Sequence, residues 1–241
     1  MDAAYPIEII AHRGDRSRFP ENTLPAFQSA IDAGATGLEL DLHITSDHQI
    51  VIHHDPALSQ QLTDPPLIYS LSLSTLKTLD FGASIPTLGE LLALCRFHPE
   101  ILLDLELKCE PPLTPPPELF ARLVLKETAL SSSPILYSSF NAEVLSALRK
   151  IKPDARLLLL FWSEDLPLSR VLETARALNV EALGPDEPLL TSEFMEQLKP
   201  FRVIPWTVND PARWKQLIDL GVSGIITDAP QELVRFLSNS N

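Results

Sequence analysis

The sequence is poor in cysteine, which limits how the fold can be held together. Cys95 and Cys109 are the two cysteines among 241 residues. Two thiols are too few for a disulfide framework, so we expect reduced thiols in a cytoplasmic protein. A single bridge between Cys95 and Cys109 is the alternative. The apolar fraction of 45% is large enough to build a packed core instead.

Long apolar runs are missing as well. No stretch of the sequence approaches the roughly 18 apolar residues that a membrane-spanning helix needs. The first six residues contain no basic segment followed by an apolar one, so we expect no secretory signal. Both absences predict a protein without stable membrane insertion.

Basic residues are scarce relative to acidic ones. The chain has 19 Lys and Arg residues against 32 Asp and Glu residues, which gives a formal net charge of −13. A surface of this charge repels polyanions, so we expect no nucleic-acid partner. A small substrate that carries phosphate would need cations placed locally around it. The composition does not predict an oligomeric state.

Short apolar runs alternate with segments of helical periodicity along most of the chain. Strands are predicted at residues 7–11, 36–42, 49–53, 101–108, 134–137, 156–160, 180–183, 202–205 and 224–226. Helices are predicted at residues 24–33, 72–79, 87–97, 118–128, 141–151, 168–178, 191–198, 211–220 and 230–237. This alternation is typical of βα units and a parallel sheet.

Eight of these strands each lead to a helix, and this number favours a closed barrel. We therefore expect an α/β fold in which residues 1–241 form a single (β/α)8 barrel domain. Residues 56–86 form a short excursion between the second and third barrel strands. A doubly wound open sheet is the alternative architecture.

Two carboxylates stand two residues apart at the end of the second predicted strand. Because side chains alternate along a strand, Glu39 and Asp41 point to the same side, with leucines on the other. Two like charges that converge in this way raise each other's pKa unless a cation lies between them. Oxygen ligands suit a hard cation such as Mg²⁺ or Ca²⁺. A solvated edge strand with two acidic residues is the simpler alternative.

Further reactive residues follow other predicted strands, as catalytic residues do in barrels of this kind. Glu106 could complete a metal site with Glu39 and Asp41, and Arg13 and Lys108 could neutralise a phosphate. His12 and His54 could divide the proton transfers, since histidine titrates near neutral pH.

The same strand ends carry residues with simpler interpretations. Asp228 is a candidate helix cap as much as a site residue, and Trp206 could belong to an ordinary barrel core. His53 is expected to lie outside the site. Four further residues are expected to be mainly structural, namely Ser139, Phe140, Phe161 and Trp162.

The ordered motifs resemble the glycerophosphodiester phosphodiesterase family, in its bacterial cytoplasmic form. They are HRG at 12–14, PENT at 20–23, ELD at 39–41, HD at 54–55, IPTL at 85–88, LELK at 105–108, SF at 139–140, WTVN at 206–209 and ITDAP at 226–230. The resemblance implies a TIM barrel hydrolase of lipid and glycerol metabolism. Its substrates would be small glycerophosphodiesters such as glycerophosphocholine or glycerophosphoethanolamine, which it cleaves to glycerol 3-phosphate and an alcohol.

The resemblance also implies roles for particular residues. Glu39, Asp41 and Glu106 match the ligands of one divalent metal ion, magnesium or calcium, with manganese or zinc as alternatives. His12 and His54 match the general acid and base, without showing which is which. Arg13 and Lys108 match phosphate contacts, and Trp206 matches an apolar wall at the glycerol end.

Two other functions are compatible with the same motifs. One is a lysophospholipase D-like barrel that acts on lysophospholipids. The other is a barrel without catalysis that serves as a binding module. The chain departs from the family pattern in its turn at 46–49 and in the shortness of the segment 56–86, which predicts no large lid.

Overall fold

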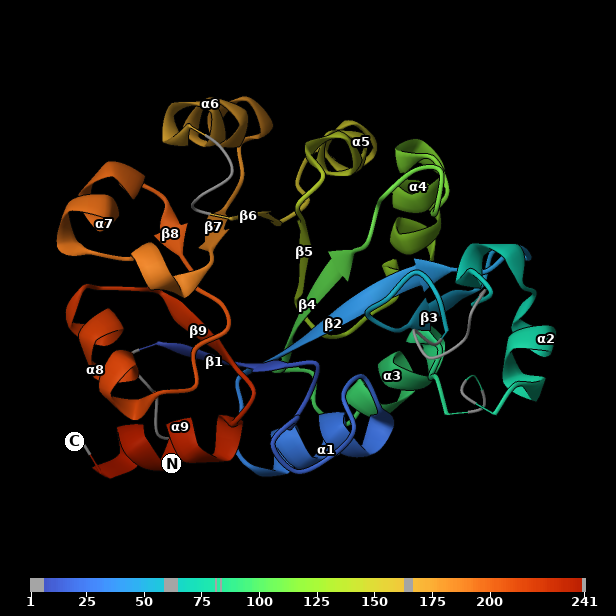
Figure 1. The fold of residues 1–241 in the computed structure, drawn as a ribbon, viewed down its shortest axis with the longest axis horizontal. Helices are drawn as coiled ribbons and strands as arrows, with labels where there is room; N and C mark the ends of the chain where they lie inside the picture. Colours follow the sequence, from blue (N-terminus) through green and yellow to red (C-terminus); the bar gives the residue numbers. More distant parts are fainter. Residues whose placement is uncertain (1–6, 59–64, 81, 83, 163–166, 240–241) are drawn as a thin grey trace.

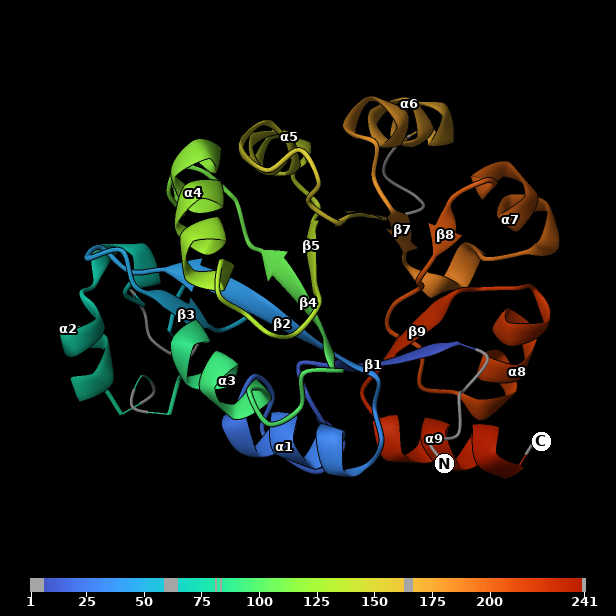
Figure 2. The same cartoon turned by 180° about the vertical axis from the view of Figure 1, so that it is seen from behind.

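Helices form a ring around a central group of strands. The computed structural model describes residues 7–58, 65–80, 82, 84–162 and 167–239. In Figure 1 the ring runs from α1 through α3, α4, α5, α6, α7 and α8 to α9, and Figure 2 shows the same order from behind. The expectation for residues 1–6 and part of that for 56–86 lie outside the described residues.

The strands form one sheet that curls almost into a closed barrel. They are β1 (Glu8–His12), β2 (Gly37–Ile44), β3 (Ile50–Ile52), β4 (Leu102–Leu107), β5 (Ile135–Ser139), β6 (Leu157–Phe161), β7 (Ala182–Pro185), β8 (Arg202–Val203) and β9 (Gly224–Thr227). The order is β8-β7-β6-β5-β4-β2-β1-β9, with β3 paired to β2 alone. All pairings are parallel except β2 with β3.

The last gap of the barrel is bridged by backbone hydrogen bonds between the segments around β8 and β9. The amide of Ile226 donates to the carbonyl of Pro205 at 3.0 Å, and the amide of Val208 donates to the carbonyl of Ile226 at 2.9 Å. A doubly wound open sheet would instead have free edges far apart. The eight-stranded barrel is thus confirmed, with β3 as an additional strand.

The helices begin and end near the predicted positions. They are α1 (Leu24–Asp32), α2 (Leu73–Thr78), α3 (Leu88–Cys95), α4 (Pro117–Thr128), α5 (Ala142–Ile151), α6 (Leu168–Leu178), α7 (Ser192–Leu198), α8 (Pro211–Asp219) and α9 (Pro230–Asn239), with 3-10 turns η1 (Ile68–Ser70) and η2 (Glu187–Leu189). Local chemistry explains the starts. The hydroxyl of Thr23 accepts from the amide of Ala26, and Thr87 and Glu90 form a capping box.

The core has two apolar layers, which leaves one end of the barrel for polar groups. The larger layer lies between the strands and the surrounding helices. A smaller layer fills the barrel interior and consists of Ile10, Leu102, Leu136, Leu158, Leu160, Ala182, Ile204 and Ile226. Leu102 and Leu136 lie near the start of their strands, and Glu106 lies near the end of β4, so this end of the barrel interior is left to charged residues.

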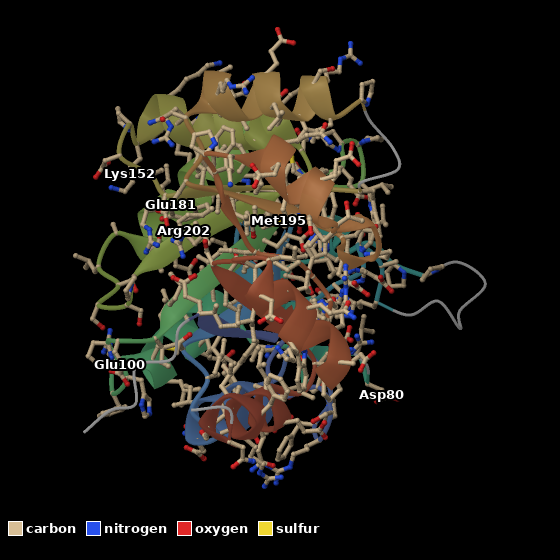
Figure 3. All side chains as sticks on the ribbon, turned by 90° about the vertical axis from the view of Figure 1, so that its left-hand side faces the viewer. Asp80, Glu100, Lys152, Glu181, Met195 and Arg202 are labelled. Atoms are coloured by element: carbon tan, nitrogen blue, oxygen red, sulfur yellow. The ribbon has the colours of Figure 1, made fainter. Side chains whose placement is uncertain are left out.

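A chain of ion pairs links four strands at the opposite end of the barrel. Arg202 contacts Glu181 and Glu8, and Arg156 contacts Glu181 through two hydrogen bonds of 2.6 and 2.7 Å. Figure 3 shows Glu181 and Arg202 side by side. These residues stand at or just before β1, β6, β7 and β8, so the chain of charges ties the barrel together at its base.

Apolar residues of the excursion at 56–86 form a small separate cluster with a residue of β3. Val51, Leu58, Ile68, Leu76 and Ile85 form this cluster. The helix predicted at 72–79 is confirmed as α2, with the hydroxyl of Ser72 as its cap.

The structure also bears on the expected state of the two cysteines and on the expected lack of a membrane-spanning helix. Cys95 and Cys109 are both buried and free, so no disulfide joins them. Among the residues that the structure describes, no helix is long and apolar enough to cross a membrane.

Candidate active site

Three carboxylates meet where β2 and β4 end. In the β2–β4 register Asp41 lies opposite Glu106, and Glu39 lies two residues earlier on the same face of β2. One carboxylate oxygen from each of the three residues lies within 4.8 Å of the others. All three side chains are buried, so these charges are held away from bulk water. The predicted cluster of Glu39, Asp41 and Glu106 is therefore present in the fold.

Two cations neutralise part of this charge. The Nζ atom of Lys108 lies 3.0 Å from Oδ1 of Asp41 and 2.6 Å from Oε1 of Glu106. The Nε atom of Arg13 lies 3.0 Å from Oδ2 of Asp41. Lys108 and Arg13 thus contact the carboxylates directly.

The pKa values reflect this balance of charges. Burial raises the pKa of Glu39 well above its ordinary value, and the charges of Asp41 and Glu106 raise it further. Burial also acts to raise the pKa of Asp41, but Lys108 and Arg13 outweigh it and hold that pKa below its ordinary value. Burial brings the pKa of Glu106 to about 7, against the opposing effect of Lys108.

A tight turn after β1 places Arg13. Arg13 and Gly14 both have a positive φ, of 54° and 85°, and the turn carries the backbone amide of Arg13 to Oε2 of Glu39 at 2.9 Å. The guanidinium group also contacts Oε1 of Glu21 at 2.9 Å. A β-carbon on Gly14 would lie 2.7 Å from the backbone of Ala26, so this turn requires glycine.

Asn22, within the PENT motif at 20–23, also belongs to the site. Its side-chain amide donates to Oδ2 of Asp41 at 2.7 Å, and it is buried with a φ of 57°. Thr23 is the cap of α1. The motif at 20–23 thus supplies a cap and a support for Asp41 from adjacent residues, and the local sequence does not separate these two roles.

The two histidines each pair with an aspartate through Nδ1. Nδ1 of His12 lies 2.6 Å from Oδ1 of Asp228, and Nδ1 of His54 lies 2.7 Å from Oδ1 of Asp55. Burial lowers the pKa of His54, and the nearby charges of Lys108 and Arg13 add to this effect against that of Asp41. Both histidines line the same pocket as Glu39 and Glu106.

Two further histidines lie nearby with different surroundings. His53 directs Nδ1 to the backbone carbonyl of Asp55 and is absent from the pocket lining, as predicted. His43 is buried and contacts the carbonyl of His54 through Nε2 at 3.0 Å. Burial lowers the pKa of His43 to about 4, so it supports the backbone of His54 as a neutral ring.

Aromatic rings line the other half of the pocket. Trp206 packs edge to face against Trp162 with ring centroids 4.6 Å apart, and against Phe140 at 5.4 Å. Its indole nitrogen donates to the carbonyl of Gly184 at 2.7 Å. Phe140 and Trp162 remain 39% and 49% exposed, so the expectation that they are mainly structural misses their place at the pocket mouth.

The other two residues of that group differ in surroundings. Ser139 and Phe161 are buried, in agreement with a structural role. The hydroxyl of Ser139 donates to the carbonyl of Leu107 at 2.8 Å. Asp104 is a further polar residue of the pocket, and it accepts a 2.6 Å hydrogen bond from Ser138. Burial raises the pKa of Asp104 to about 7.

The donor set fits a hard divalent cation. The pocket measures about 570 Å³, and its lining includes Glu39, Glu106, Lys108 and the two histidines. Oε1 of Glu39 is buried and has no hydrogen-bond partner within the described residues. An unpartnered carboxylate oxygen beside two further carboxylates matches what magnesium or calcium takes as ligands.

Fold and site together define the class of protein. The chain is a TIM-like barrel with an acidic cluster, two cations and two histidines at the carboxyl ends of its strands, where barrel enzymes have their active sites. The family profile of the glycerophosphoryl diester phosphodiesterase family matches residues 12–232.

Individual glycerophosphodiester phosphodiesterases are also similar to the chain over most of its length. The chain is 31% identical over 240 residues to a glycerophosphodiester phosphodiesterase of Caldanaerobacter subterraneus subsp. tengcongensis, across 95% of this chain and 97% of the relative. The fold is similar to a glycerophosphodiester phosphodiesterase from Thermotoga maritima, with a TM-score of 0.79, 26% identity, and coverage of 95% of this chain and 97% of that one.

A third similar protein has been solved with a bound ligand. The chain is similar to an Oleispira antarctica phosphodiesterase in complex with the product sn-glycerol 3-phosphate, with a TM-score of 0.85, 26% identity, and coverage of 96% of each chain. The chain therefore belongs to the glycerophosphoryl diester phosphodiesterase family, and its activity is that of a glycerophosphodiester phosphodiesterase.

Proposed function

We propose that this enzyme hydrolyses small glycerophosphodiesters, such as glycerophosphocholine and glycerophosphoethanolamine, to glycerol 3-phosphate and the free alcohol. The observation that carries the proposal is the cluster of three buried carboxylates, two of which, Glu39 and Glu106, line one pocket together with two histidines. The glycerol 3-phosphate bound to the Oleispira antarctica phosphodiesterase supports the same product class for this chain.

Glu39, Asp41 and Glu106 would hold one divalent cation, magnesium or calcium, with manganese or zinc as alternatives. When bound, the cation supplies positive charge to the phosphate oxygens. It would also offset the excess negative charge of the site, because three carboxylates face only two cations, Lys108 and Arg13.

Arg13 and Lys108 would bind the phosphate from the side of the carboxylates. Both side chains are mostly buried, so their orientation is fixed by the ion pairs to Asp41 and Glu106 before substrate binds. A fixed cation loses little conformational entropy on binding, which favours recognition of a compact anion. The glycerol end would lie against Trp206, whose ring is held by the carbonyl of Gly184.

His12 and His54 would divide the proton transfers. His12 ends β1, His54 follows β3, and both line the pocket. Each has its Nδ1 paired to an aspartate, which leaves Nε2 to meet the substrate. One ring would take a proton from the attacking oxygen, and the other would give one to the leaving alcohol.

Variants of the two histidines test this assignment. We expect His12→Ala and His54→Ala each to lower the rate of glycerophosphocholine hydrolysis by about 10²–10⁴-fold. Metal affinity, measured by calorimetry, should stay close to that of the wild type. His98→Ala is the matched control, because His98 precedes β4 at the other end of the barrel. Near-normal turnover in either site variant would refute the proton-transfer role of that histidine.

A substrate panel separates this function from the two alternatives. A lysophospholipase D-like enzyme would favour lysophosphatidylcholine micelles over soluble glycerophosphocholine, whereas we expect the reverse. A binding module without catalysis would hydrolyse neither. Hydrolysis of glycerophosphocholine with release of choline, measured by a coupled choline assay, is the outcome that supports the proposal.

A further inference from the structure

Two polar residues to which the proposed chemistry gives no role form a chain of contacts that ends at His12. Asp228 follows β9, and Asn209 lies in the segment that joins β8 to α8. Oδ1 of Asp228 lies 2.6 Å from Nδ1 of His12, and Oδ2 accepts a hydrogen bond of 2.7 Å from the side-chain amide of Asn209. Both oxygens of one carboxylate are therefore engaged across 216 and 19 residues of sequence.

Neighbouring contacts fix the orientation of the Asn209 amide. Its Oδ1 accepts from the backbone amide of Asp228 at 2.9 Å and from the hydroxyl of Thr227 at 3.1 Å. The NH₂ group of Asn209 must therefore be the part that faces Asp228. This leaves Oδ1 of Asp228 as an acceptor directed at the His12 ring.

The contact determines which ring nitrogen of His12 carries the proton. An ionised carboxylate only accepts hydrogen bonds, so Nδ1 of His12 must donate. In a neutral ring the proton then resides on Nδ1, and Nε2 presents a lone pair to the pocket that His12 lines. A helix cap does not explain the geometry, since α9 begins at Pro230, two residues beyond Asp228.

We propose that Asp228 is a positioning residue that fixes the tautomer and ring direction of His12, and that Asn209 in turn fixes Asp228. This inference rests on the proposed proton-transfer role of His12. Arg16 lies 3.4 Å from Oδ1 of Asp228 and is 41% exposed, so it adds charge at the rim of this chain of contacts.

The substitution Asp228→Asn tests the inference with almost no change in volume. The NH₂ group of Asn209 would bind the new amide oxygen, so the new NH₂ group would face Nδ1 of His12. Nδ1 would become the acceptor, and the proton would move to Nε2. We expect kcat for glycerophosphocholine to fall about 10²–10⁴-fold, with KM and metal affinity within about threefold of wild type.

Asp210→Asn is the matched control. Asp210 lies one residue beyond Asn209 and caps α8 through the amide of Ala212, a bond that asparagine also makes. This variant should keep wild-type kcat. Wild-type kcat in Asp228→Asn would overturn the positioning role. Equal losses in kcat, metal affinity and thermal stability would also overturn it, because they would indicate a structural role.

Nitrogen-15 NMR of the histidine rings tests the same inference without turnover. The signals of His12 are assigned by their absence in His12→Gln, and we expect the Nδ1–H tautomer in wild type and the Nε2–H tautomer in Asp228→Asn. An unchanged tautomer would overturn the inference. Failure of wild type to hydrolyse any glycerophosphodiester would instead overturn the proposed function, so the two failures are distinguishable.

Discussion

Gly14→Ala should destabilise the fold for two separate reasons, backbone conformation and overpacking. Gly14 has a φ of 85°, and a β-carbon there would lie 2.7 Å from the carbonyl carbon and the β-carbon of Ala26 and 2.9 Å from its carbonyl oxygen. The left-handed backbone costs an alanine about 1–2 kcal/mol. Overpacking against helix α1 adds about 1–3 kcal/mol. We expect a loss of about 2–5 kcal/mol, a large part of the stability of a typical domain.

Gly221→Ala separates the two contributions. Gly221 has nearly the same φ, 84°, but apart from its chain neighbours no atom of the described residues lies within 4 Å of an added β-carbon. Urea unfolding followed by tryptophan fluorescence should show a loss of about 1–2 kcal/mol for Gly221→Ala and a clearly larger one for Gly14→Ala. Equal losses would refute the claim that the turn after β1 presses against Ala26.

Three further predictions concern the barrel base, the thiols and the support of Asp41. Glu181→Gln should lower the free energy of unfolding by about 1–2 kcal/mol in urea, because Glu181 binds both Arg156 and Arg202. Asp154→Asn, at an exposed ion pair, should leave the free energy of unfolding unchanged; equal effects would contradict a role for the base in barrel stability. Burial raises the pKa of Cys95 and Cys109 to about 11. At pH 8, iodoacetamide should therefore label both thiols only after the protein is unfolded, as detected by mass spectrometry. Rapid labelling of the native protein would contradict their burial. Asn22→Ala should weaken divalent metal binding about 10–100-fold by calorimetry, since Asn22 donates to Asp41 without being a ligand, and unchanged affinity would show that this bond does not orient the carboxylate.

Local patterns in the sequence are enough to predict the barrel and the acidic side of its mouth. Alternating side chains on β2 put Glu39 and Asp41 on one face, and the parallel order brings Glu106 beside Asp41. Each of these placements depends on one strand and its neighbour. Strand periodicity predicts the face on which each side chain lies, and the order of the elements predicts which strands are neighbours.

The parts of the site that the sequence analysis left open or missed depend on contacts between distant segments. Asp228 meets His12 across 216 residues, and the nearby Pro230 makes a helix cap an equally good local interpretation. Phe140 and Trp162 directly follow the neighbouring strands β5 and β6, and both line the pocket. Their rings stack with centroids 5.9 Å apart because these two strands are paired. Side-chain direction beyond a strand end is set by packing, which the pattern of residue types does not specify.

The central claim is that one divalent cation, held by Glu39, Asp41 and Glu106, is required for hydrolysis. The most direct measurement titrates magnesium, and separately calcium, into chelator-treated protein while heat and glycerophosphocholine hydrolysis are both followed. We predict one bound ion per chain and activity that returns along the binding curve, with both lost in Glu39→Gln. Full turnover by the metal-free protein, or undiminished metal binding in Glu39→Gln, would contradict the claim.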